Sequence, residues 1–235
     1  TSNSRVGTTF SYPSSGQARP HAPTQISGGA LGTLAFSYDA NGNMTSGNGK
    51  TFNWRPDDLP SSITASGVTV NFTYDAVGER IKKLNTSTGA ATLYPFDDFE
   101  ISGNTLTKFI TGESLGSIAK RVTDLSTNST STFWLHGDRL GSLNVTSDAT
   151  GAEVGRVAFR PYGEILSQTG NQTSKTFIDE RIDPETGLSY LHARYYDPAL
   201  GLFIGVDPAE ADMNTFRYAY GDPINMMDPN GQFGF

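Results

Sequence analysis

Apolar and polar residues alternate with a period of two along much of this chain. Residues 68–72 (VTVNF) place an apolar side chain at every second position, and this spacing is typical of a β-strand that buries one face. No segment sustains apolar residues at helical spacing over the ~12 residues that a stable helix needs. The pattern predicts an all-β protein made of antiparallel hairpins.

A loose repeat accompanies this alternation. The segment FSYDANGNMTS (36–46) is echoed by FTYDAVGERIKK (72–83), 36 residues later. Aromatic residues mark successive units at spacings of 16, 20 and 20 residues: Tyr38, Trp54, Tyr74 and Tyr94. A repeat of about 20 residues is typical of a hairpin that must stack on its neighbours to bury a face.

The two Tyr-Asp pairs have an expected structural role. We expect Tyr38 and Tyr74 to be core or cross-strand aromatics. Asp39 and Asp75 are expected to cap the turns that follow, through hydrogen bonds from the main chain to their carboxylates.

The chain divides into three segments on composition. Residues 1–30 are rich in Ser, Gly and Pro and have little apolar periodicity, which predicts an N-terminal arm that is flexible or ordered by a partner. Residues 31–135 are expected to form the repeat ribbon, and residues 136–235 a separate C-terminal segment. Because Thr1 is not a start methionine, we expect the chain to be a piece of a longer protein.

Composition and charge restrict the possible partners. Charged residues make up 17% of the chain, below the ~25% usual for soluble domains, and this is typical of an extracellular β protein. The net charge of −7 and the pI of about 4.9 argue against nucleic acid and anionic membranes as partners. No apolar run approaches the ~18 residues of a membrane span, so we expect no membrane insertion.

The sequence contains no pattern for a cofactor or a metal. There is no cysteine, which excludes disulfides, thiol catalysis and thiolate metal sites. His21, His136 and His192 lack the close spacing of a transition-metal site. Phosphate loops, dinucleotide fingerprints and nucleophile elbows are likewise missing from the sequence. We expect no metal, no cofactor and no enzyme that turns over.

The last sixty residues are dense in one dipeptide. Asp-Pro favours turn initiation and extended geometry before the proline, so short strands separated by tight turns are predicted. The dipeptide recurs at Asp183-Pro184, Asp197-Pro198, Asp207-Pro208, Asp222-Pro223 and Asp228-Pro229.

These motifs resemble those of the RHS/YD-repeat family. YDANGN and YDAVGE are similar to the dipeptide that names the family, and residues 136–165 are similar to the stretch before its core segment. Residues 185–208 and 216–232 are similar to the core-associated signature. Its matched positions include Tyr195, Tyr196, Asp197, Asp228 and Pro229.

The resemblance implies a fold and a role. In this family the hairpin ribbon spirals into a hollow shell whose core segment plugs one end, so this chain should form an open shell segment ending in a plug. Some members enclose a C-terminal toxin domain, and the teneurins use the shell as an adhesion scaffold. The expected partners are other segments of the same polypeptide, other copies of it, a toxin domain, and carbohydrate stacked on Trp54 or Trp134. The expected location is secreted or cell-surface.

The resemblance also implies a single self-cleavage of the chain. Family members cleave after Asp-Pro-x-Gly-Leu with core aspartates, which maps the cut here between Gln232 and Phe233. Asp207 and Asp183 match the candidate carboxylates, and Arg194 matches the motif's arginine. Two aspartates hydrolyse a peptide only if the fold brings them together; otherwise both are turn caps before proline.

Two positions depart from the family pattern. Gln232 stands where the family has Leu, which alters the residue whose carbonyl would be attacked. Leu202 stands where the family has Arg, which removes a cation near the aspartates.

A second hypothesis follows from the short length of the ribbon. An open ribbon leaves unpaired strand edges, and such edges recruit other strands. If the arm at residues 1–30 paired with another copy, the contact would be heterologous and would build a filament or tube. A hydrolase with an external substrate has little support, because no nucleophile and base are paired.

Overall fold

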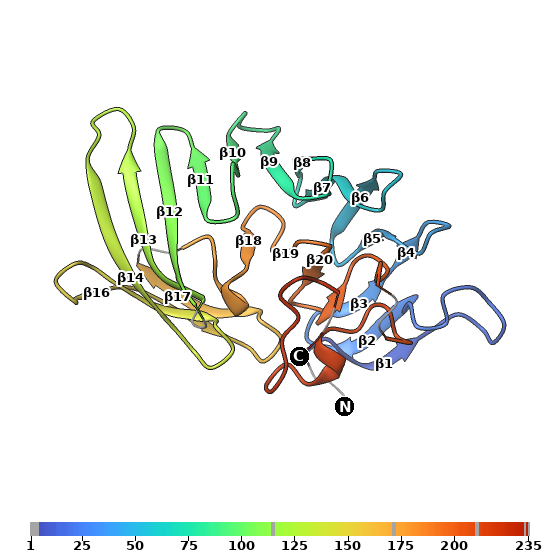
Figure 1. The fold of residues 1–235 in the computed structure, drawn as a ribbon. Helices are drawn as coiled ribbons and strands as arrows, with labels where there is room; N and C mark the ends of the chain where they lie inside the picture. Colours follow the sequence, from blue (N-terminus) through green and yellow to red (C-terminus); the bar gives the residue numbers. More distant parts are fainter. Residues whose placement is uncertain (1–4, 114–115, 171–172, 210–211, 233, 235) are drawn as a thin grey trace.

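The computed structural model describes residues 5–113, 116–170, 173–209, 212–232 and 234, and its strands form three antiparallel sheets. The largest has fourteen strands in sequence order, β4 to β17, and we call it the wall. Two smaller sheets are built from β1–β3 and from β18–β21. Figure 1 shows the wall arching over the β18–β21 sheet, which we call the inner sheet. The all-β prediction is confirmed.

The strand bounds are as follows. The first sheet comprises β1 (Gly7–Ser11), β2 (Gln25–Gly29) and β3 (Gly32–Ala35). The first half of the wall comprises β4 (Ser37–Tyr38), β5 (Met44–Gly47), β6 (Lys50–Trp54), β7 (Pro60–Ala65), β8 (Val68–Tyr74), β9 (Arg80–Asn85) and β10 (Ala91–Leu93). The second half comprises β11 (Phe99–Ser102), β12 (Thr105–Gly112), β13 (Gly116–Asp124), β14 (Thr130–Gly137), β15 (Leu143–Ser147), β16 (Glu153–Phe159) and β17 (Ile165–Gly170).

The inner segment has short strands. They are β18 (Arg181–Asp183), β19 (Leu188–Leu191), β20 (Arg194–Asp197) and β21 (Leu202–Phe203). Two single-turn 3-10 segments, η1 (Phe177–Asp179) and η2 (Ala219–Gly221), are the helical elements of the described residues. No described helix is long and apolar enough to cross a membrane.

Alternation along the wall strands determines which side chains face inward. In β8, Val70, Phe72 and Tyr74 are buried, whereas Asn71 and Thr73 are exposed. The buried side chains pack in one cluster with residues of the inner sheet, including Leu188, Tyr190 and Tyr195. The inward face of the wall and the inner sheet therefore share a hydrophobic core.

The Tyr-Asp repeat forms one recurring turn. The Asp75 amide donates to the Glu79 oxygen at 2.9 Å, and the Asp75 carboxylate accepts the amides of Val77 and Glu79, each at 2.9 Å. Gly78 has a φ of +91°, which favours glycine. The same main-chain hydrogen bonds occur at Asp39, where the carboxylate accepts the Asn43 amide at 2.9 Å.

The tyrosine of each pair fastens its turn to an earlier segment. The Tyr74 hydroxyl donates to the Pro60 oxygen, and the Tyr38 hydroxyl donates to the Pro23 oxygen, each at 2.9 Å. Burial raises the pKa of both phenols, so both remain donors at physiological pH. In both units the tyrosine hydroxyl thus joins the turn to the main chain of an earlier segment.

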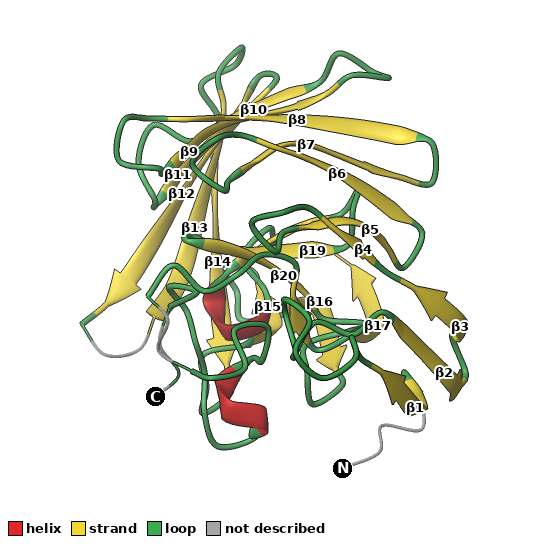
Figure 2. Ribbon diagram, turned by 90° about the vertical axis from the view of Figure 1, so that its right-hand side faces the viewer, coloured by secondary structure: helices red, strands yellow, loops and turns green. Residues whose placement is uncertain are grey.

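The wall curves around the inner sheet. In Figure 2, β6–β8 pass above β19 and β20, while β12 and β13 lie to one side. The centre of the inner sheet is shielded from solvent, since all residues of β19 and β20 are buried. A second cluster packs Phe177 and Leu191 against Tyr196, Phe203 and Tyr218.

The segment boundaries differ from the sequence expectation in two places. From Arg5 onward, residues 5–30 are ordered on their own chain, because Val6 and Ile26 are 2% and 0% exposed within the main core. The wall also continues past residue 136 as far as Gly170. The two apolar side chains of Val6 and Ile26 therefore anchor the Ser/Gly-rich residues 5–30 in the core, which the composition of this segment did not indicate.

Candidate functional site

Strand β20 presents alternate side chains to two different parts of the molecule. Tyr195 and Asp197 contact the wall, where Tyr195 packs on Phe72 and Asp197 pairs with Lys50 at 2.9 Å. Arg194 and Tyr196 instead contact the C-terminal segment. This alternation follows from strand geometry. Through β20 the wall is connected to residues 228–232 (DPNGQ), which directly precede the expected cut and which we call the C-terminal phrase.

Arg194 is the centre of the candidate site. Its Nη2 lies 3.3 Å from Asp228 Oδ2 and 3.5 Å from Asp207 Oδ2, and these three side chains are 3–4% exposed. Its Nη1 donates to the Thr215 oxygen at 2.8 Å, and its guanidinium lies 3.6 Å from the Phe203 ring centre. A single cation thus brings together two carboxylates from separate turns.

The Arg194 guanidinium also holds the main chain of the C-terminal phrase. Arg194 Nε donates to the Gly231 oxygen, and the Gln232 amide donates to Asp228 Oδ1 at 3.0 Å. Both sides of the Gly231–Gln232 peptide group are therefore hydrogen-bonded by the cluster. The bond expected to break lies one peptide later, and Phe233 lies outside the described residues.

Close packing fixes this phrase on the β19–β20 turn. The Ala193 amide donates to the Asn230 oxygen at 3.2 Å. Gly231 has a φ of +67°, and a Cβ atom there would lie 2.5 Å from the Leu191 oxygen. A side chain at residue 231 would therefore push the phrase away from Arg194.

Burial and the neighbouring carboxylates act on the charge of Arg194 in opposite directions. Burial lowers the pKa of the Arg194 guanidinium, and Asp207 and Asp228 counteract this only in part. A buried cation is stable only when it is paired and hydrogen-bonded. The Asp207 carboxylate is fixed in turn by the Ala209 amide, which donates to its Oδ1 at 2.9 Å. The turn-cap role expected for Asp207 and the placement beside Arg194 therefore coexist.

Asp183 occupies a different cluster. Its Oδ2 lies 2.6 Å from Arg80 Nη1 and its Oδ1 3.3 Å from Lys83 Nζ, with its side chain 1% exposed. Among the contacts of the described residues, none joins Asp183 to Asp207. The carboxylate that shares Arg194 Nη2 with Asp207 is that of Asp228. The sequence identified Asp228 as a position of the core-associated signature, but it did not pair this residue with Asp207.

The two tryptophans lie in different environments. Trp54 is packed near Phe52, and its indole nitrogen donates to the Met44 oxygen at 2.7 Å. Trp134 is 47% exposed on β14. Carbohydrate stacking stays a prediction, and Trp134 is the better candidate. Within the described residues, no group of three His, Asp or Glu side chains is arranged to hold a metal ion.

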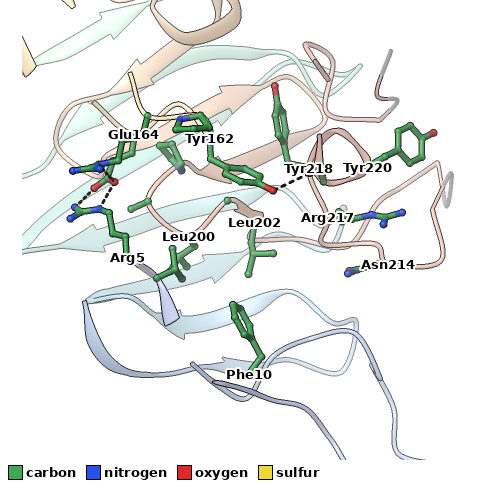
Figure 3. A pocket seen from close by; sticks show the side chains of 17 residues that line it. Arg5, Phe10, Tyr162, Glu164, Leu200, Leu202, Asn214, Arg217, Tyr218 and Tyr220 are labelled. Atoms are coloured by element: carbon green, nitrogen blue, oxygen red, sulfur yellow. Dashed lines mark hydrogen bonds and ion pairs between the residues drawn. The ribbon is translucent and has the colours of Figure 1, made fainter. Parts of the chain in front are cut away.

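A cavity of about 680 Å³ lies where the N-terminal strand, the wall and the C-terminal segment meet. Figure 3 shows Arg5 paired with Glu164 at one end, and Tyr162 whose hydroxyl donates to the Gly221 oxygen at 3.3 Å. Phe10, Leu200 and Leu202 supply its apolar lining. The Arg5–Glu164 pair fastens the start of the chain to the turn before β17.

This arrangement matches a known family. The sequence model of the Teneurin YD-shell matches residues 25–225, which is most of the chain. The chain belongs to the Teneurin YD-shell family. The recurring Asp-capped turns and the curved wall are thus the YD-shell architecture, and the RHS/YD resemblance inferred from the sequence is confirmed.

Several much longer proteins contain a similar segment. The tRNA nuclease WapA of Bacillus subtilis strain 168 is 29% identical over 222 residues, which cover 85% of this chain and 9% of that protein. Double-stranded DNA deaminase toxin A of Burkholderia cenocepacia strain H111 is 25% identical over 246 residues, covering 86% of this chain and 17% of the toxin. This YD-shell chain therefore spans less than a fifth of either relative.

Solved structures share the fold. The crystal structure of TcdB2-TccC3-Cdc42 aligns over 95% of this chain and 13% of its own chain, with a TM-score of 0.73 and 19% identity. The crystal structure of TcdB2-TccC3 aligns equally well, with a TM-score of 0.72 and 20% identity. At these identities the likeness establishes the YD-shell fold and no more.

Proposed function

We propose that this chain is the closing part of a YD-shell that encloses a toxin domain of the same polypeptide, in a secreted or cell-surface protein. The observation that carries the proposal is the position of the C-terminal phrase. Gly231 and Asp228 are buried beside Arg194, on a segment whose inner sheet lies under the arch of the wall. A chain continuing from Gln232 would start next to the inner sheet, on the side that the arch of the wall leaves open in Figure 1, and we infer that the enclosed domain follows there.

Relatives support the toxin-domain partner. Two of the matched proteins are named as a tRNA nuclease and a DNA deaminase toxin, and this chain matches only a small share of each. We infer that such activities reside elsewhere in those proteins. In this chain the role is structural: the wall and the inner segment separate the enclosed domain from its surroundings.

We further propose one self-cleavage, between Gln232 and Phe233. Water attacks the Gln232 carbonyl carbon while one carboxylate takes its proton; the C–N bond then breaks and the Phe233 nitrogen leaves as an amine with a proton from the second carboxylic acid. Asp207 and Asp228 are the candidate pair, because both approach Arg194 Nη2. An aspartyl reaction of this kind needs one ionised and one protonated carboxyl.

The departure at Gln232 bears on the rate of this reaction. The amide of Gln232 is held by Asp228 whatever its side chain, so the Leu-to-Gln difference leaves the main-chain anchor intact. Leu202, at the family's Arg position, lines the cavity of Figure 3 together with Leu200. Arg194 is the cation that contacts both carboxylates.

The test is a chain extended beyond Phe235 by a folded reporter domain. Intact mass spectrometry should find one product ending at Gln232 and another beginning at Phe233, and Asp207→Asn should prevent both. Asp222→Asn, at another Asp-Pro turn where the aspartate is half-buried, is the matched control and should cleave normally. Uncut wild-type chain, or cleavage that persists in Asp207→Asn, would rule out the proposed reaction.

The filament hypothesis relied on strand donation by residues 1–30. In this chain β1 pairs with β2 of the same sheet, and donation would require Val6 and Ile26 to leave the core. Electron microscopy of the purified chain tests assembly directly. Fibres that disappear when residues 1–25 are deleted would favour the hypothesis, whereas single compact particles would count against it.

A further inference from the structure

Arg80 is the most enclosed cation of the wall. Its side chain is 0% exposed, and its guanidinium lies 4.4 Å from the Tyr190 ring centre and 4.8 Å from that of Tyr94. Its Nη1 donates to Asp183 Oδ2 at 2.6 Å and to the Tyr195 hydroxyl at 3.2 Å. One wall residue therefore contacts three strands of the inner sheet: β18, β19 and β20.

The Arg80–Asp183 pair is costly to disrupt. A buried charge that loses its partner is strongly destabilising, because its desolvation is no longer offset. Lys83 Nζ lies 3.3 Å from Asp183 Oδ1 and 2.9 Å from Glu185 Oε2, so the wall supplies a second cation from β9. The inner sheet consequently fits the wall in one register, with Asp183 between two cations.

This register determines the position of the candidate cleavage cluster. Tyr195 contacts Arg80, and the adjacent residue Arg194 projects from the opposite face of β20 toward Gly231. Because neighbouring residues of a strand share one rigid backbone, a shift of Tyr195 on the wall would move the Arg194 guanidinium as well. Small displacements of a positioning group are enough to slow a reaction severely.

We propose that Arg80 and Asp183 are positioning residues, which dock the inner sheet on the wall and thereby hold Arg194 against the Gly231–Gln232 peptide. The proposal rests on the self-cleavage proposed above. It assigns Asp183 a role away from the reacting atoms, and it makes cleavage conditional on a folded wall. A chain whose wall has not closed on the inner sheet would keep its downstream domain attached.

The experiment compares two ion pairs that both link the wall to β18. The test variant is Arg80→Met/Asp183→Asn, which removes both charges of the pair and leaves Lys83 paired with Glu185. The control is Arg181→Met/Asp97→Asn, which removes the 2.7 Å pair at the start of the inner sheet, away from β20. It also removes the contacts of Arg181 with Glu100 and of Asp97 with Lys175, so it disturbs the charges there at least as much as the test variant does. Hydrogen exchange of the Gln232 amide is measured by NMR in the chain itself, and cleavage is measured in the reporter-extended chain.

We expect the Gln232 amide to exchange about tenfold faster or more in the test variant, as local opening increases, and to change little in the control. Cleavage should slow by about 100-fold with an unchanged pH profile, as for a positioning residue. Equal exchange in both variants would overturn the proposal. An altered pH profile would also overturn it, because Asp183 would then itself transfer a proton.

The exchange measurement separates this inference from the cleavage proposal. If the wild-type chain does not cleave, the reaction is wrong, but exchange at Gln232 still decides whether the pair positions the phrase. If the test variant does not fold, Arg80→Lys provides the same comparison, since it keeps the charge and loses the contacts of the planar guanidinium. Gln232 exchange at the wild-type rate in Arg80→Lys would then overturn the proposal.

Discussion

Arg80 Nη1 of the wall and Asp183 Oδ2 of the inner sheet lie 2.6 Å apart, with side chains that are 0% and 1% exposed. The two residues are 103 positions apart in the sequence. Their contact is one of the points at which the curved ribbon and its inner segment pack together.

Removing one partner of this pair should be costly. We expect Arg80→Met to lower the free energy of unfolding by about 3–5 kcal/mol, because Asp183 loses its nearest cation in a buried site. Arg80→Met/Asp183→Asn should be less destabilising than the single variant. Urea unfolding measures both, and a double variant less stable than the single one would contradict this account.

His192 should make stability depend on pH. Burial alone would lower the pKa of its imidazole, but Glu180 and Glu79 raise it to about 9; the Nδ1–Glu79 Oε2 distance is 2.9 Å. A raised folded-state pKa contributes stability that is complete below the usual value of ~6.5 and is lost as pH rises through 9.

Comparing wild type with His192→Gln tests this pH dependence. The variant should be less stable by on the order of 2 kcal/mol at pH 6, after discounting for partial exposure of the side chain. The difference should shrink by pH 10. His136→Gln is the control, because the imidazole of His136 contacts the Ser147 hydroxyl and, among the ion pairs of the described residues, none joins it to a carboxylate. A difference that stays constant with pH would refute the protonated His192.

Gly231 and Gly187 provide a matched pair of substitutions. Both have positive φ, +67° and +70°, but a Cβ atom meets the Leu191 oxygen at 2.5 Å only at Gly231 and has open space at Gly187. Gly187→Ala should cost about 1 kcal/mol from backbone strain. Gly231→Ala should cost about 1–3 kcal/mol more from the steric clash. Thermal or urea unfolding measures both, and equal costs would show that residue 231 is not closely packed.

The Asp75 carboxylate that caps the repeat turn should make a measurable contribution to the stability of the protein. Asp75→Ala removes the acceptor of the Val77 and Glu79 amides and should lower stability by about 1 kcal/mol. Asp75→Asn should retain most of this stability, because the side-chain oxygen of asparagine can still accept a hydrogen bond from these amides. Asp57→Ala is a suitable control: Asp57 makes an exposed pair with Arg55, worth at most ~1 kcal/mol. Equal losses at Asp75 and Asp57 would argue against capping.

Much of the fold could be predicted from local sequence. The alternation at residues 68–72 identified a strand and its buried face, and the Asp39 and Asp75 motifs identified turns whose hydrogen bonds the structure confirms. These features depend on contacts within a few residues. The role of Val6 and Ile26 was missed, because anchoring by two apolar side chains depends on a distant core.

The sequence by itself determined the β-hairpin ribbon, its turns and the identity of the residues in the C-terminal phrase. Only the tertiary structure decided which carboxylates meet: Asp228 approaches Asp207 through Arg194, while Asp183 pairs with Arg80. The reason is physical. Strand alternation and Asp turns follow from backbone geometry at short range, whereas the pairing of buried charges depends on how fourteen strands curve around the inner sheet.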